Sequence, residues 1–87
     1  MKPEIRKPTE AENKEAGAWP IWEKEVSEFE WEYDSREICL ILEGQADVTN
    51  ESNEKFSFGK GDYIIFPKGM KCTWKVNKKI KKHYNFD

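Results

Sequence analysis

The chain has 87 residues, of which 37% are apolar and 37% are charged, and its formal net charge is −2. This length suits one small domain, residues 1–87, whose core depends on four Trp, three Tyr and five Phe. Two cysteines are too few for a disulfide scaffold. We find no signal peptide and no apolar run near the roughly 20 residues that span a bilayer, which argues against a membrane protein. We therefore expect a soluble protein of the cytoplasm or an organelle stroma.

The N-terminal part of the chain predicts an edge strand and a short helix. Residues 1–8 carry one apolar residue between charges and end at a proline, which is typical of an edge strand. Thr9 and Glu12 have the spacing of a capping box, which predicts a helical turn over about 10–16. The apolar stretch Trp19–Trp22 is interpreted first as core, with the end of a barrel or a dimer seam as alternatives.

From residue 28 onward the pattern predicts short strands separated by turns. Aromatic and glutamate residues alternate up to residue 33, which places Phe29, Trp31 and Tyr33 on one face. The apolar run that follows predicts a strand buried on both faces and stopped by Glu43–Gly44. The expected strands of this part are 28–33, 37–42, 46–49, 56–58, 63–66, 71–76 and 80–86.

The stretch from residue 61 to residue 76 is the clearest strand–turn–strand signal. Gly61–Asp62 and Pro67–Gly69 are turn sequences on either side of a buried strand. After the second turn, Cys72, Trp74 and Val76 fall on one face. In total, eight or nine short strands with regular turn signals predict an antiparallel sandwich or barrel.

Charge is distributed unevenly along the chain. Residues 1–54 hold fifteen acids and six bases, a net of −9, whereas residues 55–87 hold nine bases and two acids, a net of +7. Strand alternation makes most of the basic residues an outward, solvated face, and no arginine lies among them, so we expect no nucleic-acid partner. These lysines are Lys71, Lys75, Lys78, Lys79, Lys81 and Lys82. On the last strand, one face carries Ile80, Lys82, Tyr84 and Phe86.

One acid, three glycines and a proline have a diagnostic spacing. Six residues separate Glu37 from Gly44, sixteen separate Gly44 from Gly61, and five separate Gly61 from Pro67, with Gly69 two positions further on. In this order and spacing the residues resemble the two motifs of the cupins.

The chain resembles, over nearly its whole length, the small single-domain cupins of the ureidoglycine aminohydrolase cupin-domain group (Cupin_3, DUF861). The segments that also carry this resemblance are 19–23, 29–33, 41–44, 66–69 and 82–85. The resemblance implies an all-β fold, the cupin double-stranded β-helix or jelly-roll-like antiparallel barrel, with one short N-terminal helical turn. We also expect a homodimer that uses the N-terminal strands and the Trp19–Trp22 edge, since a core this small gains from dimerisation.

The resemblance implies four metal-ligand positions, of which only Glu37 keeps a ligand. The three histidines of the metal-dependent family members would fall at Trp31, Tyr33 and Cys72. An indole cannot coordinate, a phenol is a poor ligand near neutral pH, and one carboxylate with one thiolate does not complete a set for Mn, Fe or Zn. We therefore expect a metal-free protein with no cofactor. Elemental analysis that finds about one transition-metal ion per chain would contradict this.

If the side chains at these positions point inward, as they do in cupins, they form an aromatic-walled pocket with a single acid. In the first functional hypothesis, a small polar or planar metabolite binds there, and Glu37 accepts its hydrogen bonds or acts as a general base. The expected lining residues are Trp31, Tyr33, Glu37, Cys39, Cys72 and Trp74.

Two alternatives stay open beside this hypothesis. In the first, the barrel is filled, Glu37 is satisfied by the Trp31 N–H and the Tyr33 hydroxyl, and the protein is a non-catalytic structural or protein-interaction module. The second is an aminohydrolase-like enzyme by family analogy, which the missing ligands disfavour. The sequence does not decide whether there is any turnover.

Cys72 is a weak candidate for a catalytic nucleophile. Apolar walls and a neighbouring carboxylate raise the pKa of a thiol, which opposes its activation. The single histidine, His83, lies on the opposite face of its strand from the aromatic residues, so a Cys–His pair has no support. A Cys39–Cys72 disulfide requires Cα atoms within about 7 Å and is not expected in a reducing compartment.

Overall fold

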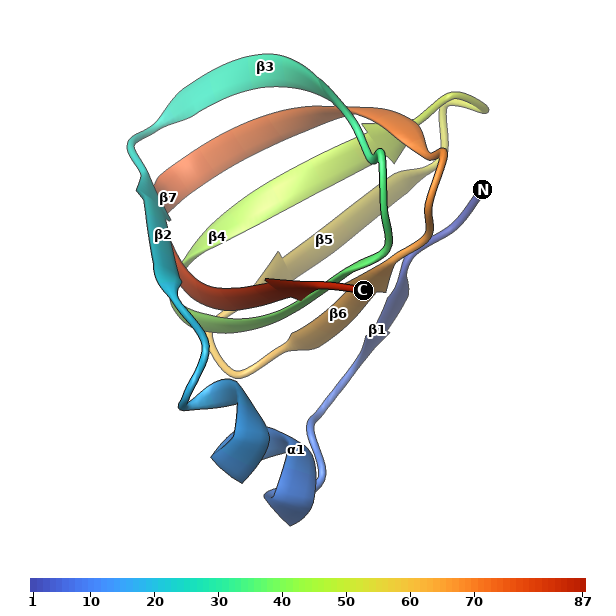
Figure 1. Ribbon diagram of the computed structural model, residues 1–87. Helices are drawn as coiled ribbons and strands as arrows, with labels where there is room; N and C mark the ends of the chain where they lie inside the picture. The colour runs from blue at the N-terminus through green and yellow to red at the C-terminus, as the bar shows by residue number, and fades with distance from the viewer.

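The computed structural model describes all residues, 1–87, as one short helix and seven strands. The strands form one antiparallel sheet of order β1-β6-β4-β7-β2, in which β3 also pairs with β7 and β5 also pairs with β4. The sheet curls into a barrel with α1 outside one end (Figure 1). The antiparallel all-β barrel expected from the sequence is therefore confirmed. The elements are β1 (Glu4–Arg6), α1 (Glu10–Ala16), β2 (Ile21–Lys24), β3 (Ser27–Glu32), β4 (Glu37–Asn50), β5 (Lys55–Gly59), β6 (Tyr63–Phe66) and β7 (Lys71–Phe86).

Two long strands, β4 and β7, replace four of the short strands that the sequence predicts. The expected stops at Glu43–Gly44 and near Asn77 are wrong, because both strands continue through these positions. Asn77 has no partner in the β4–β7 register and is the extra residue of a bulge. Its side-chain amide donates to Gln45 Oε1 at 2.7 Å and to Asp47 Oδ2 at 3.1 Å on β4. The barrel consequently has seven strands instead of eight or nine.

Gly44 marks an irregularity in the β4–β7 pairing, not the end of a strand. The register shifts three times between Ile41 and Ala46, as a β-bulge requires. Gly44 has a φ of 96°, and a Cβ atom built on it would lie 2.1 Å from the carbonyl oxygen of Lys79. The two backbones can approach this closely only because residue 44 has no side chain.

The helix α1 begins where the sequence predicts. The Thr9 hydroxyl accepts a hydrogen bond from the Glu12 amide at 3.2 Å, and the Glu12 carboxylate accepts one from the Thr9 amide at 2.9 Å, so the capping box is confirmed. Arg6 adds two hydrogen bonds to the Glu12 carboxylate, of 2.6 and 2.7 Å, and holds the pKa of that carboxyl down to about 2.

None of the chain's helices has the length and the apolar character that crossing a membrane requires.

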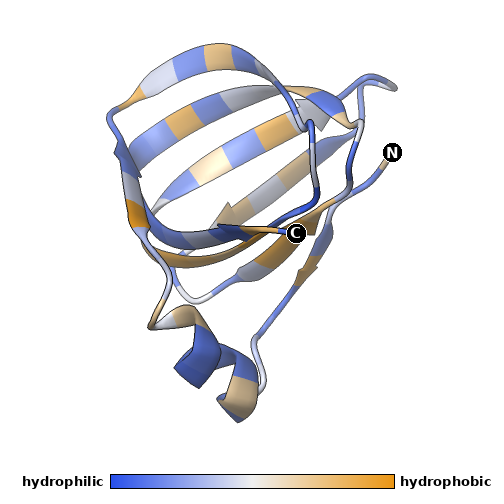
Figure 2. Cartoon of the chain, in the orientation of Figure 1, coloured by the Kyte–Doolittle hydropathy of each residue, from blue (hydrophilic) through white to orange (hydrophobic).

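The core lies inside the barrel and is largely aromatic. Apolar and polar residues alternate along the strands, most visibly on β3 and β7 (Figure 2), so that each strand contributes every second side chain. Tyr33 stacks on Phe66 with ring centroids 4.7 Å apart, and Phe58 meets Trp74 edge-on at 5.2 Å. The fully buried members with the largest side chains are Trp74, Tyr33, Phe66, Ile41, Ile64, Met70 and Ile80.

The Trp19–Trp22 stretch divides between two environments. Trp19 packs against a small cluster of Ala16, Leu40 and Tyr63 beside the helix. Trp22 lies on β2 and packs against the main core. Core was the first interpretation of this stretch. Each indole packs against a different one of the two apolar clusters.

Candidate functional site

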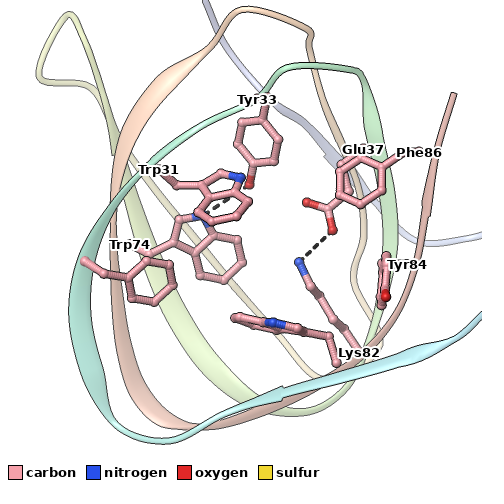
Figure 3. A pocket seen from close by; sticks show the side chains of 9 residues that line it. Trp31, Tyr33, Glu37, Trp74, Lys82, Tyr84 and Phe86 are labelled. Carbon is pink, nitrogen blue, oxygen red and sulfur yellow. Dashed lines mark hydrogen bonds and ion pairs between the residues drawn. The ribbon is translucent and has the colours of Figure 1, made fainter.

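A cavity of about 210 Å³ lies inside the barrel, between β2, β3 and the ends of β4 and β7. It opens toward solvent beside Trp31 and Phe86, whose side chains are 49% and 46% exposed. Its aromatic walls surround one lysine and one glutamate, which point toward each other (Figure 3). The lining residues are Trp22, Phe29, Trp31, Tyr33, Glu37, Trp74, Lys82, Tyr84 and Phe86.

Pairing of β3 and β2 with β7 builds the aromatic wall. Phe29 lies directly opposite Trp74 in the β3–β7 register, and their rings stack at 6.0 Å with an angle of 11°. Trp22 packs edge-on against both rings, at 6.4 Å from Phe29 and 6.1 Å from Trp74. Cross-strand aromatic pairs of this kind stabilise the sheet by up to about 1 kcal/mol each, so the wall is held by contacts within the protein.

The polar element of the cavity is an ion pair between Lys82 and Glu37. Lys82 Nζ donates to Glu37 Oε2 at 2.8 Å, and each side chain is only 5% exposed. The ammonium also lies 4.7 Å from the ring centre of Trp22 and 4.9 Å from that of Trp74. Buried charges are tolerated when they are paired, and here the two indole faces add a further attraction for the cation.

Glu37 and Tyr33 each keep hydrogen-bonding capacity for a ligand. Glu37 Oε1 has no protein partner, and it is not an unsatisfied buried atom, so it is accessible from the cavity. The Tyr33 hydroxyl accepts a bond from Trp74 Nε1 at 3.1 Å, while no protein group accepts its proton. Burial, followed by the charge of Glu37, raises the pKa of Tyr33 far above its usual value. Tyr33 is therefore a neutral phenol that can donate.

Four of the six residues expected to line the pocket do so, namely Trp31, Tyr33, Glu37 and Trp74. Cys39 does not, because it is completely buried in the packed core. Cys72 does not line this cavity either, and borders a separate polar hollow with Asn50 and Glu51. Strand parity places both cysteines on the inner face, but it does not say how far along the barrel each lies.

The partner of Glu37 differs from the expected one. We expected the Trp31 N–H and the Tyr33 hydroxyl to satisfy this carboxylate in a filled barrel, whereas Lys82 does so. The packed core fills one part of the barrel interior, and the cavity occupies the rest. Sequence reasoning missed Lys82 as a site residue, although it shares one face of β7 with Ile80 and Tyr84, which is the signal that could have found it.

The residues at the family's metal-ligand positions do not fit a metal ion. No group of three or more His, Cys, Asp or Glu side chains comes together anywhere in the chain. The one remaining carboxylate, Glu37, is already bonded to the ammonium of Lys82, which would repel a second cation. The chemistry available at this site is therefore that of a lysine, a carboxylate and a phenol.

We expect both cysteines to be unreactive in the native protein at neutral pH. They are free and buried, and burial raises the pKa of Cys39 to about 12 and that of Cys72 to about 11. Because the thiolate is the reactive form, alkylation by iodoacetamide should be slow at pH 7 and become fast only when the protein is unfolded in denaturant. Rapid native labelling of Cys72 at pH 7 would contradict this.

A Cys72–His83 pair is absent from the structure. His83 Nδ1 lies 2.8 Å from the carbonyl oxygen of Trp19, near the helix end of the barrel. Cys72 Sγ instead donates to the Trp31 carbonyl oxygen at 3.7 Å, at the start of β7. With no histidine in reach, and with burial and the nearby carboxylate of Glu51 raising its pKa, the Cys72 thiol has no support as a nucleophile.

Comparison with known proteins places these features in context. Residues 11–84 match the family described as EutQ-like cupin domain. A DUF861 family protein from Thermotoga maritima has a similar structure, with 51% identity over 99% of this chain and 100% of that chain and a TM-score of 0.95. No protein with curated function matches the chain.

Two solved EutQ proteins share the fold. The EutQ protein of Clostridium difficile is 26% identical, over 76% of this chain and 52% of that chain, with a TM-score of 0.69. A putative ethanolamine utilization protein Q from Salmonella typhimurium is 24% identical, over 76% and 53%, with the same TM-score. The chain therefore spans about half the length of these EutQ proteins, and the second likeness concerns the fold alone.

Proposed function

Because this chain belongs to the EutQ-like cupin domain family, we propose that its barrel binds a small planar, polar molecule without a metal ion, with Glu37 as the polar anchor. The observation that supports the proposal is an aromatic-walled cavity of about 210 Å³ that contains one buried ion pair. An apolar cavity of about 150 Å³ is enough for benzene, so this one has room for a single ring with a polar substituent.

The free groups of the cavity suggest what that substituent does. Glu37 Oε1 can accept a hydrogen bond, and the hydroxyl proton of Tyr33 can be donated. A ligand that carries both a donor and an acceptor, such as a carboxamide, would use both groups. The rings of Trp22 and Trp74 would contact its planar part.

Titration with benzamide and with toluene, followed by Trp fluorescence, tests the proposal. Benzamide should give a saturable change, and its affinity should fall about 10–100-fold in the double variant Glu37→Met/Lys82→Met, since hydrogen bonds to charged groups contribute about 1.5–3 kcal/mol. Toluene has no polar group and should bind both proteins with similar affinity.

A surface variant provides the matched control. Glu28→Gln/Lys75→Met removes one acid and one lysine that are exposed and paired across β3 and β7, so it should leave benzamide binding unchanged. No saturable response to either probe would contradict the proposed function. Equal benzamide affinity in the wild type and Glu37→Met/Lys82→Met would contradict the role of Glu37.

A protein-interaction role is the second candidate. The edge strand β2 pairs only with β7 and exposes 49% of Ile21, so the expected homodimer would extend the sheet there. Ile21→Lys should then convert a dimer into a monomer in sedimentation analysis, whereas a wild type that is already monomeric at high concentration would rule this homodimer out. An aminohydrolase-like activity rests on family analogy alone, because the side chains at its ligand positions are those of Trp31, Tyr33 and Cys72.

A further inference from the structure

The cavity holds a buried primary amine beside a carboxylate, a combination that the binding proposal leaves without a chemical role. We propose that Lys82 is a carbonyl-reactive lysine, which forms a reversible iminium with a small ring-bearing aldehyde while Glu37 transfers the protons. This inference rests on the proposed function, because the aldehyde must enter the same cavity.

Geometry supplies the two requirements for such a lysine. A lysine must give up its ammonium proton before its nitrogen can attack a carbonyl, and the proton acceptor within reach is Glu37 Oε2, 2.8 Å from Lys82 Nζ. The lysine also needs a site from which water is largely excluded, because water is a product of iminium formation. Lys82 lines the cavity and yet is only 4% exposed, with aromatic rings on most sides.

The step balances without any oxidant or reductant. Glu37 takes one proton from the Lys82 ammonium, and the amine lone pair attacks the carbonyl carbon, so that a C–N bond forms and the C=O π bond opens. A second proton moves from nitrogen to oxygen and gives a carbinolamine. Glu37 then returns its proton to the hydroxyl group, the C–O bond breaks, water leaves and the iminium forms.

The electrostatics of the site suit the product as well as the starting amine. Ammonium and carbonyl become iminium and water, so the same nitrogen carries the positive charge at the start and at the end of the reaction. The indole faces of Trp22 and Trp74 and the carboxylate of Glu37 attract this charge before and after the reaction. The Tyr33 hydroxyl proton, which no protein group accepts, is available to the carbonyl oxygen.

Trapping with benzaldehyde and sodium cyanoborohydride tests the inference. Cyanoborohydride reduces an iminium irreversibly and spares the aldehyde, and peptide mass mapping then locates the benzyl group on individual lysines. Lys82 should be modified at least about tenfold faster than the exposed Lys75 and Lys78, which serve as controls within the same chain. Benzyl alcohol, which lacks a carbonyl, should compete with the reaction.

The variant Glu37→Gln removes the proton acceptor and should slow modification of Lys82 by about 100-fold or more. Near-UV circular dichroism will show whether this variant keeps its fold. If it does not, the distribution of label in the wild type alone decides.

The outcomes distinguish the reactive lysine from the binding site. Saturable binding of benzaldehyde and benzyl alcohol with no preference for Lys82 would overturn the reactive lysine and leave the binding site intact. Absence of both binding and labelling at Lys82 would overturn both claims. Preferential labelling of Lys82 that benzyl alcohol suppresses would support both.

Discussion

Replacing Lys82 by methionine is expected to lower the free energy of unfolding by about 3–5 kcal/mol. The substitution shortens the side chain by only one atom but leaves the Glu37 carboxylate without its 2.8 Å partner, in a position where it is only 5% exposed. An unpaired buried charge is among the most destabilising changes a core can undergo. Urea denaturation of the wild type and the variant at pH 7 measures the effect.

A double-mutant cycle separates the pair from the packing around it. Glu37→Met/Lys82→Met removes both charges and keeps similar volumes, so it should be more stable than Lys82→Met alone by about 2 kcal/mol or more. If the two variants were equally destabilised, the loss would come from packing against Trp22 and Trp74, and the ion pair would not be the element that stabilises this part of the barrel.

Gly44→Ala is expected to destabilise the protein by about 3–5 kcal/mol. Residue 44 has a φ of 96°, and its Cβ would lie 2.1 Å from the Lys79 carbonyl oxygen and 2.7 Å from that of Lys78. Both obstacles are backbone atoms of β7, which can move only if the β4–β7 ladder is disturbed. Thermal and urea denaturation of the variant measure the loss.

Gly61→Ala is the matched control for this substitution. Gly61 has a nearly equal φ of 89°, but its nearest neighbour would be the flexible Lys7 Nζ at 3.5 Å. Only the cost of a left-handed backbone remains, which is about 1–2 kcal/mol. Equal losses at the two positions would contradict the close approach of β4 and β7 that we describe at the bulge.

Local signals in the sequence were sufficient for much of the fold. The capping box at Thr9 and Glu12 depends only on residues within one helical turn. The inward faces of β3 and β7 follow from a period of two. The continuation of β4 through Gly44 could not be predicted in this way, because a glycine that ends a strand and one that permits a bulge have the same local sequence and differ only in the neighbouring strand.

The sequence predicted four of the residues that line the cavity and missed Lys82. Trp31, Tyr33, Glu37 and Trp74 were identified because motif spacing and strand parity both point to them. Lys82 was grouped with the solvated lysines by strand alternation, and a charged residue is rarely buried unless it is paired. Its partner, Glu37, lies 45 positions away in the sequence, so no local pattern reveals the pair. Cys39 was wrongly expected to line the cavity, because strand parity tells which face of the sheet a side chain is on but not its position along the barrel axis.

The central claim is that the cavity bounded by Trp22, Trp31 and Trp74 is the ligand site, and the indole N–H resonances test it most directly. The chain has four tryptophans, and Trp19 alone lies outside this cavity, in the separate cluster beside the helix. In a ¹H–¹⁵N NMR titration with benzamide, the indole signals of Trp22, Trp31 and Trp74 should shift and saturate together while that of Trp19 stays fixed. Shifts centred on Trp19, or none at any indole, would contradict the account.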